Sequence, residues 1–593
     1  DTSYIDYITY ALESEYQYMT LSNDNESGIH GVIIPKFTAR NGSHKFRFAI
    51  DFGTTNTHIE YSVDGSTSSN PFDITEKDMQ IQKLHITDDY MINDVFNSDF
   101  IPATIGGESL YGYPMRTVIS ESNNTNWDKA VLAMANVNIP YTYEKSLSLP
   151  YNVLHTDLKW STNTEDKKRA SKYIESILLM LRTKVLLNNG DLSKTEIVWF
   201  YPASMTQNRF NKFKAEWENT FATLFGAPIS NIIAASESVA PYYYHKAKKG
   251  ATSTVVSVDI GGGTTDVLIV DKGEPKYLTS FRFAANTIFG DGYSYDSDSN
   301  GFVNKYKDII TNQLETNNLR GLKAVLKSVL DKRVSTDVIA FLFSLASNKE
   351  IKKEKVEINF AKMLADDNRG KYVVILFYVA IVYHIAKLMK AKGFDMPRHM
   401  TFSGNGSKVL NILSTNDATL VRLTKIIFEE IYAQSYSIDG LDIIRPANSK
   451  ESTCKGGIIL TPFQSQDYGE IKDMKTILIG TDNEKFADVH MTYNDVTEAD
   501  LDSVVDVIKE YIEFTFKLDK KFSFYDNFDV DRSIMNKVKD LCYRDIRTYL
   551  ENGLAIKKSE IAQDGADDNL EETLFFYPLV GIINAVVRNI YQM

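Results

Sequence analysis

Two segments of the chain share one pattern, and together they constrain the fold more than any other feature. Residues 48–57 read FAIDFGTTNT, and residues 256–266 read VSVDIGGGTTD. Each is an apolar β-type run that ends in an aspartate, followed by a glycine turn with two threonines and a second β-type run. The two aspartates are 208 residues apart (259 − 51), which is far enough for each segment to belong to its own lobe. The repeat predicts two lobes, each with a similar β-hairpin.

The residue types in these hairpins suit phosphate and a divalent cation. Glycine lets the backbone approach an anion and present its N–H groups, and threonine hydroxyls add donors. An aspartate supplies a hard oxygen for magnesium or for its bound waters. A single such segment has the alternative of being a tight turn without a ligand, whereas two facing hairpins favour a phosphate chain held from both sides. The predicted phosphate-binding residues are Gly53, Thr54, Thr55 and Asn56, then Gly261, Gly262, Gly263, Thr264 and Thr265, with Asp51 and Asp259 as the metal-binding residues.

Composition restricts the class of protein. A chain of 593 residues is too long for one core, and we expect about three to four domain-sized units. With 43% apolar and 24% charged residues it is typical of a soluble globular protein, and its net charge of −13 argues against broad nucleic-acid binding, because a polyanion would be repelled. The two cysteines, Cys454 and Cys542, exclude a disulfide framework. We therefore expect a reducing compartment, the cytoplasm.

Two further stretches bear on membranes and targeting. Residues 372–386 are apolar except for His384, and Lys371 and Lys387 bound them. A bilayer crossing needs about 20 residues, so this stretch predicts a buried helix that leads into the next strand, and no membrane span. The chain begins with Asp1 and shows no signal-peptide pattern, and we expect it to be a piece of a longer protein.

Periodicity and turn signals divide the chain into four parts. We expect an N-terminal extension at 1–45, a first lobe at 46–250, a second lobe at 251–460 and a mainly helical C-terminal region at 461–593. In the lobes, the expected helices lie at 165–187, 207–224 and over most of 302–390, and the expected strands at 197–200, 231–235 and 399–402. In the C-terminal region we expect long helices at 497–518 and 533–551. The predicted fold is therefore α/β, with two lobes of mixed sheet and a helical extension.

In this order of landmarks the chain resembles the actin, hexokinase and heat-shock-chaperone ATPase superfamily, and it is most similar to the heat-shock chaperone nucleotide-binding domain. The matching segments are the two hairpins, Tyr201-Pro202-Ala203-Ser204 with Arg209, Ser236-Glu237-Ser238, Gly290-Asp291-Gly292-Tyr293 with Asp296, Phe402 to Lys408, and Lys455-Gly456-Gly457. They span residues 45–460. The resemblance implies a two-lobed actin-like fold around a nucleotide cleft, and it implies that Gly404, Gly406, Ser407 and Lys408 bind the adenosine.

The resemblance also implies catalytic roles. Asp51 and Asp259 would hold magnesium through waters, and Glu237, or else Asp266, would orient or deprotonate the attacking water. Lys159 would lie beside the terminal phosphate. The alternatives are a solvent-facing or capping carboxylate for Glu237 and a plain surface lysine for Lys159.

The chain departs from the family at two places. Asn405 stands where a second glycine is usual, with Lys408 where an arginine is usual. The connecting helix after Glu237 carries Pro241 and the three tyrosines at 242–244 in place of small residues. Since small residues allow close helix contacts, the tyrosines predict altered packing between the lobes.

Four functions remain open at this point. The leading prediction is a probable magnesium-dependent ATPase that acts as a nucleotide-driven switch on a protein partner. The alternatives are a polymerising actin-like protein with head-to-tail contacts, a kinase for a sugar or an acid, and a nucleotide-binding scaffold without turnover. The implied ligands are ATP or ADP and Mg²⁺.

Overall fold

The protein is described here by a computed structural model. It describes residues 16–22, 28–36, 42–54, 56–75, 77, 105–106, 115–122, 152–155, 158–160, 164–202, 205, 207–249, 254–293, 297, 300–437, 440–445, 449–460, 492–564, 570 and 572–593. Four residues of the predicted motifs lie outside this part of the chain: Thr55, Ala203, Ser204 and Asp296. Residues 461–491 and most of the extension before residue 45 also lie outside it.

Two mixed sheets dominate the fold, and they have the same topology. In each, a central strand pairs with an antiparallel strand on one side and a parallel strand on the other, and a further strand extends each side in the same sense, antiparallel to its neighbour on the first side and parallel to its neighbour on the second. The first sheet has the order β10-β9-β3-β4-β5, with β6 also paired to β4, and the second has the order β13-β12-β11-β14-β15. The first sheet's strands are β3 (Phe46–Phe52), β4 (Asn56–Val63), β5 (Asn70–Pro71), β6 (Met115–Arg116), β9 (Glu196–Tyr201) and β10 (Ile232–Ser236). The second sheet's strands are β11 (Val255–Ile260), β12 (Thr265–Asp271), β13 (Glu274–Phe281), β14 (His399–Ser403) and β15 (Asp442–Ile444).

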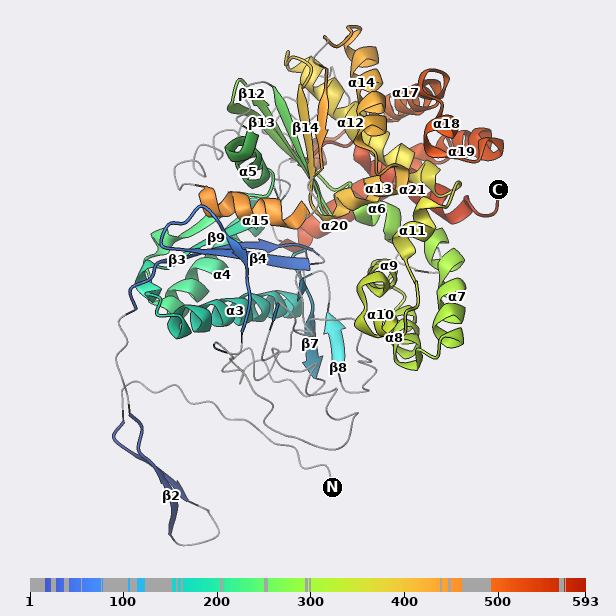
Figure 1. The fold of residues 1–593 in the computed structure, drawn as a ribbon. Helices are drawn as coiled ribbons and strands as arrows, with labels where there is room; N and C mark the ends of the chain where they lie inside the picture. Colours follow the sequence, from blue (N-terminus) through green and yellow to red (C-terminus); the bar gives the residue numbers. More distant parts are fainter. Residues whose placement is uncertain are drawn as a thin grey trace.

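Side chains alternate along these strands, and the alternation builds separate layers. Phe48 and Ile50 of β3 face a core made with α3 (Thr164–Leu187) and α4 (Gln207–Phe225), whereas Ala49 faces the opposite way. In the same manner Val256 and Val258 of β11 face an outer core while Val255 faces inward. The helices α5 (Val239–Lys249) and α15 (Ser449–Ile459) fill the layer between the two inner faces (Figure 1).

The inner layer depends on glycines of α15. A Cβ at position 456 would lie 1.9 Å from the Ala240 carbonyl oxygen of α5, and one at position 457 would lie 2.5 Å from the Phe200 ring. Only glycine permits this approach. The small residue Ala240 makes the helix contact, while Tyr242 donates its hydroxyl hydrogen to the Gly273 carbonyl at 3.2 Å. The tyrosines of α5 therefore coexist with close helix packing.

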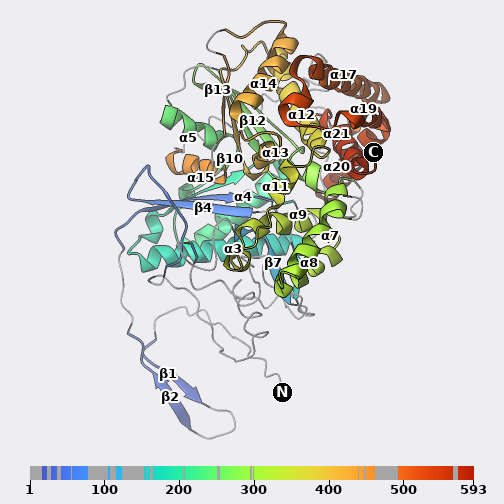
Figure 2. The same ribbon diagram turned by 45° about the vertical axis from the view of Figure 1, so that its right-hand side comes forward.

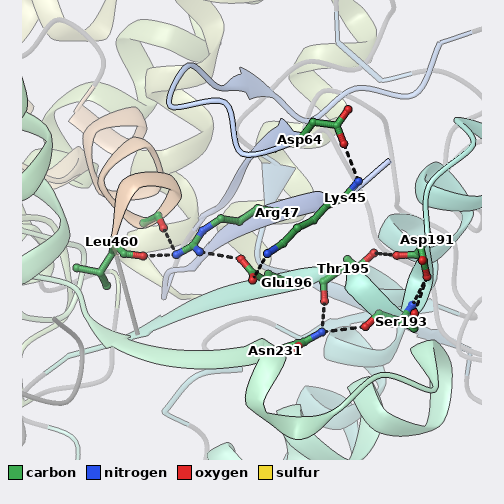
Figure 3. Close-up of polar contacts among 10 residues, drawn as sticks. Lys45, Arg47, Asp64, Asp191, Ser193, Thr195, Glu196, Asn231 and Leu460 are labelled. Carbon is green, nitrogen blue, oxygen red and sulfur yellow. Dashed lines mark hydrogen bonds and ion pairs between the residues drawn. The ribbon is translucent and has the colours of Figure 1, made fainter. Parts of the chain in front are cut away.

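Polar contacts tie α15 to the first sheet (Figure 3). Arg47 of β3 donates to Glu196 of β9 at 2.8 Å and to the Gly457 carbonyl at 3.1 Å, and it also bonds the Leu460 carbonyl. Because Arg47 is mostly buried, burial lowers its pKa, and Glu196 opposes that shift. The end of α15 is thereby fixed to the strands that carry the first hairpin.

The outer face of the second sheet carries a large helical core. Its central helix is α12 (Lys371–Ala391). This helix is long and apolar enough to cross a membrane, but 94% of its most apolar stretch is buried within the protein. The prediction of a buried helix before the strand β14 is confirmed. The other helices between β13 and β15 are α6 (Ala285–Phe289), α7 (Gly301–Thr316), α8 (Arg320–Asp331), α9 (Ser335–Ser344), α10 (Lys349–Lys353), α11 (Phe360–Ala365), α13 (Leu410–Leu413) and α14 (Asp417–Tyr432).

The C-terminal helices join this same core. They pack their apolar side chains with those of α12, α14 and the second sheet, and they lie beside these helices in both views (Figures 1 and 2). The helices are α17 (Glu498–Phe522), α18 (Phe524–Phe528), α19 (Met535–Cys542), α20 (Ile546–Asp564) and α21 (Phe576–Asn589). The helical character predicted for this region is confirmed. The single helix predicted at 533–551 is wrong, because Asp545 has φ of 55° and interrupts the helix between α19 and α20.

Two small hairpins complete the described chain. The strands β1 (Met19–Ser22) and β2 (Ile29–Ile33) form an antiparallel pair with exposed apolar side chains, and it lies apart from the two sheets (Figure 2). The strands β7 (Ile119–Ser122) and β8 (Asn152–His155) form the second pair. Trp160, which follows β8, becomes important below.

Candidate functional site

The two predicted hairpins have the same register. Asp51 pairs with His58 and Phe52 with Thr57, and 208 positions later Asp259 pairs with Asp266 and Ile260 with Thr265. The turns close in the same way. The Gly53 N–H donates to the Asn56 carbonyl at 3.2 Å, and the Gly261 N–H donates to the Thr264 carbonyl at 2.8 Å.

The tips of the two hairpins lie against each other. A Cβ built on Gly263 would be 3.5 Å from the Thr54 hydroxyl oxygen and 3.5 Å from the Trp160 ring nitrogen. Gly53, Thr54 and Asn56 of the first turn and Gly261, Gly262 and Gly263 of the second are all half-buried. Backbone N–H groups of both turns are therefore gathered at one place, which is the arrangement that binds anions.

The adenosine-type turn packs directly on the second hairpin. Gly404 has φ of 78°, and a Cβ there would lie 2.2 Å from the Ile260 carbonyl oxygen and 2.5 Å from the Asp259 carboxylate. A Cβ on Gly406 would lie 2.1 Å from the Gly261 carbonyl oxygen. These glycines are thus required by contact with the second hairpin as well as by the turn itself.

The remaining residues of this turn differ in exposure. Ser407 is buried, and its hydroxyl donates to the Gly404 carbonyl at 2.7 Å, which closes the turn. Lys408 lies at the exposed end of the short 3₁₀ helix η7 (Asn405–Val409). Of these two residues predicted to bind the adenosine, the structure therefore places the Lys408 side chain at the surface and the Ser407 hydroxyl inside.

Three carboxylates gather around Asp259. Burial is the largest cause that raises its pKa well above the ordinary aspartate value, and the nearby negative charges of Glu237, Asp51 and Asp266 raise it further. The Ser403 hydroxyl donates to Asp259 at 2.9 Å and opposes the shift, and the Thr453 hydroxyl donates to the same oxygen at 3.3 Å. Asp51 comes from the first sheet and Asp259 from the second, so the two predicted metal-binding residues are brought together.

No group of three or more His, Cys, Asp or Glu side chains within the described ranges has the arrangement to hold a metal ion directly. The neighbouring negative charges nevertheless make this place electrostatically favourable for a cation. A group whose pKa is raised by like charges is stabilised when a positive charge approaches. The donor set, carboxylate and hydroxyl oxygens, suits a hard cation such as Mg²⁺.

Lys159 and Glu237 form a buried ion pair. Lys159 is only 2% exposed, so the alternative of a plain surface lysine is wrong. Glu237 lies between β10 and α5, where its backbone N–H donates to the Tyr201 carbonyl at 3.0 Å. The pair thus stands at the end of the first sheet beside the carboxylates around Asp259.

The threonines of the second hairpin have roles within the fold. Thr265 is fully buried, and its hydroxyl donates to the Phe283 carbonyl at 2.6 Å. Thr264 is also buried. Thr265 is predicted as a phosphate donor, but in this structure its hydroxyl donates to the loop after β13.

Trp160 is not among the site residues predicted from the sequence. Its ring N–H donates to the Thr54 hydroxyl at 3.0 Å, and the Arg209 guanidinium donates to its carbonyl at 2.5 Å. The only signal was its position next to Lys159. A tryptophan in a segment 106 positions from Thr54 gives no indication of this contact in the sequence.

Comparisons with known proteins complete the description of the site. No protein-family model and no curated protein matches this chain. Two crystal structures of MreB5 of Spiroplasma citri match it, one bound to ADP with 12% identity and a TM-score of 0.32, and one bound to AMPPNP with 13% identity and a TM-score of 0.37. Each match covers 72% of this chain and 98% of the MreB5 chain. The duplicated strand order and register, and not this likeness, define the fold.

Proposed function

We propose that the chain is an ATP-binding and ATP-hydrolysing protein of the actin and heat-shock-chaperone type, in which the phosphates bind between two glycine turns. The observation that carries the proposal is the meeting of Gly263 with Thr54, with Gly404 and Gly406 packed on the second turn. Backbone N–H groups from both turns and the Thr54 hydroxyl would donate to the phosphate oxygens. The adenosine would lie along residues 404–408, toward Lys408.

The carboxylates around Asp259 support a magnesium ion. Mg²⁺ keeps several of its waters and is commonly held by one or two carboxylates together with substrate phosphates. Asp51 and Asp259 are the residues that would hold it through waters. When bound, the ion would neutralise charge on the phosphate oxygens.

Glu237 is the proposed residue that orients or deprotonates the attacking water, with Asp266 as the alternative. The ion pair with Lys159 fixes the position of the Glu237 carboxylate. Lys159 itself would lie beside the terminal phosphate, where its charge would stabilise the transition state. Both residues are buried or nearly so, which strengthens their electrostatic interaction with a bound anion.

Hydrolysis would change the angle between the two sheets, as in other hinged proteins that close around a ligand. We infer that the C-terminal helices carry this change to a protein partner, because they share one core with the second sheet and would move with it. Sedimentation with and without ATP separates this switch from a polymerising protein, since only a polymer sediments. Phosphate release measured with and without sugars or acids separates an ATPase from a kinase.

The test of the site is Asp259→Asn. We expect the variant to fold and to lose ATP turnover by on the order of 100-fold, as for removal of one stabilising group from a polar active site. Phosphate release and calorimetric titration of Mg-ATP measure turnover and binding separately. Asp506→Asn is the control, because Asp506 is an exposed aspartate of α17 whose partner is Lys509. An unchanged rate in Asp259→Asn would remove this residue from the mechanism, and absence of ATP binding in the wild type would refute nucleotide binding.

A further inference from the structure

Trp160 contacts the phosphate turn of the first sheet from a segment that the catalytic scheme does not use. Its ring N–H donates to the Thr54 hydroxyl oxygen at 3.0 Å. A hydroxyl that accepts one hydrogen bond can still donate its own proton. The indole therefore restricts the rotation of the Thr54 hydroxyl while leaving its hydrogen for an acceptor between the turns, where Gly263 lies.

Two arginines hold the indole, one from each half of the molecule. The Cζ atom of Arg209 in α4 lies 5.5 Å from the ring centroid, and the Cζ atom of Arg282 lies 5.0 Å from it. Arg282 directly follows Phe281, whose strand partner is Thr265 at the second hairpin. Trp160 is thus a point of contact between the two halves of the molecule.

Arg282 is in turn anchored by the C-terminal region. Its guanidinium pairs with Glu560 of α20 at 2.5 Å, and its backbone N–H donates to Glu572 at 3.0 Å. Glu572 also accepts a hydrogen bond from the Tyr577 hydroxyl at 3.0 Å and lies 3.5 Å from Lys557. Although burial raises the pKa of Glu572, the charges of Lys557 and Arg282 hold it below the ordinary value.

We propose that Trp160 is a positioning residue for the phosphate site, and that the C-terminal helices hold it in place through Arg282, Glu560 and Glu572. The indole sets the orientation of the Thr54 hydroxyl, and Arg282 sets the position of the indole. The C-terminal region is thereby a structural component of the site, in addition to being the output assigned to it above. The part that concerns phosphate rests on the proposed function.

A double-mutant cycle on the full chain tests the action through Thr54. Trp160→Phe keeps an aromatic ring and removes the N–H donor, and Thr54→Val removes the acceptor. We expect each to weaken Mg-ATP binding by about three- to tenfold, the value of one neutral hydrogen bond. Because both changes remove the same interaction, the double variant should bind no more weakly than Thr54→Val alone. Multiplying effects, or wild-type affinity in Trp160→Phe, would overturn the proposal.

A second measurement tests the anchoring without nucleotide. Trp160 is half-buried, and its fluorescence is obtained by subtracting the emission of Trp160→Phe from that of the parent protein. We expect Glu560→Gln to raise the acrylamide quenching of this difference signal, because the Arg282 guanidinium loses the carboxylate that it pairs with. Glu551→Gln is the matched control, since Glu551 lies on the same helix and pairs with Arg547 at 2.7 Å, outside this cluster. Unchanged quenching in Glu560→Gln would refute the anchoring.

The two measurements separate the possible failures. If the wild type binds no ATP while Glu560→Gln still raises the quenching, the anchoring stands and the proposed function fails. If ATP binds and neither Trp160→Phe nor Glu560→Gln has an effect, the proposed function stands and Trp160 has no positioning role.

Discussion

The two hairpins have the same register, so each residue of the first has an equivalent residue in the second and the two can be compared position by position. Thr54 corresponds to Gly262, Asn56 to Thr264, Thr57 to Thr265 and His58 to Asp266. The backbone hydrogen bond that closes each turn is the same. The hairpins therefore agree in what the backbone presents and differ in the side chains around it.

These differences divide the chemistry between the two sheets. His58 forms a buried pair with Glu60 at 3.0 Å, whereas its counterpart Asp266 lies opposite Asp259 and adds to the negative charge there. The first turn instead carries the Thr54 hydroxyl, where the second has Gly262. The second hairpin thus contributes Asp259 and Asp266 to the cluster of carboxylates. The first contributes Asp51 and, in addition, the Thr54 hydroxyl, to which Trp160 donates.

The largest expected effect concerns the glycine that packs on the second hairpin. Gly404→Ala would place a Cβ 2.2 Å from the Ile260 carbonyl in a left-handed backbone conformation. We expect a loss of stability of about 3 kcal/mol, measured by denaturant unfolding, because both the clash and the strain must be relieved. A loss below about 1 kcal/mol would mean that the two segments can separate at little cost.

Gly263→Ala is the contrasting change at the hairpin tip. Its Cβ would meet Thr54 and Trp160 at 3.5 Å, which is ordinary contact. We expect stability to change by only about 0.5–1 kcal/mol while Mg-ATP affinity falls, because the added methyl group occupies space between the turns. Loss of stability equal to that of Gly404→Ala would show that the tip is packed as tightly as the adenosine-type turn.

Much of this architecture could be predicted from local sequence. The aspartate–glycine hairpins and the buried helix α12 follow from residues close together in the chain, and so does the glycine turn after β14. The spacing of 208 between the two aspartates also gives the register that the structure shows, with Thr57 at the position of Thr265. Matching the threonine pairs instead would align Thr54 with Thr264, which is a different register. The contacts of Trp160 could not be predicted from the sequence, because a contact between distant segments leaves no periodic signal.

The C-terminal helices show a related limit. Their amphipathic pattern predicts that each buries one face, but it does not say against which partner. The structure packs them on the outer core of the second sheet, so residues predicted as a separate region share a core with the second half. The close contact of α5 with α15 is made by Ala240, whereas the neighbouring tyrosines of α5 predict looser packing.

Asp259 and Glu572 are two buried carboxylates whose neighbouring charges have opposite signs. The pKa of Asp259 is raised by burial and by like charges, so the folded protein binds more protons than the unfolded chain and stability falls as pH rises from the ordinary aspartate pKa through the raised one. Asp259→Asn should therefore stabilise the ligand-free protein, by on the order of 1–2 kcal/mol at neutral pH, and the gain should vanish below the ordinary aspartate pKa. Thermal unfolding across pH measures it.

Glu572→Gln is the opposite case in the same comparison. Lys557 and Arg282 hold the pKa of Glu572 below its ordinary value against the effect of burial. Its contribution to stability is thus present above the ordinary glutamate pKa and is lost as pH falls through the depressed one. We expect Glu572→Gln to destabilise the protein at neutral pH. If both variants shifted the unfolding temperature in the same direction, the assigned electrostatic contrast would be wrong.

A last comparison tests whether the threonines at the start of β4 and β12 serve the fold in both hairpins. Thr265 donates to the Phe283 carbonyl at 2.6 Å, and Thr57 accepts a hydrogen bond from the Tyr173 hydroxyl at 2.9 Å. Thr265→Val and Thr57→Val should each cost about 1 kcal/mol of stability, the net value of one buried hydrogen bond. Neither should change Mg-ATP affinity, in contrast to Thr54→Val. Weaker binding in Thr265→Val at unchanged stability would show that its hydroxyl turns to the phosphate when the ligand is bound, and the symmetry of the two buried threonines would then hold only for the ligand-free protein.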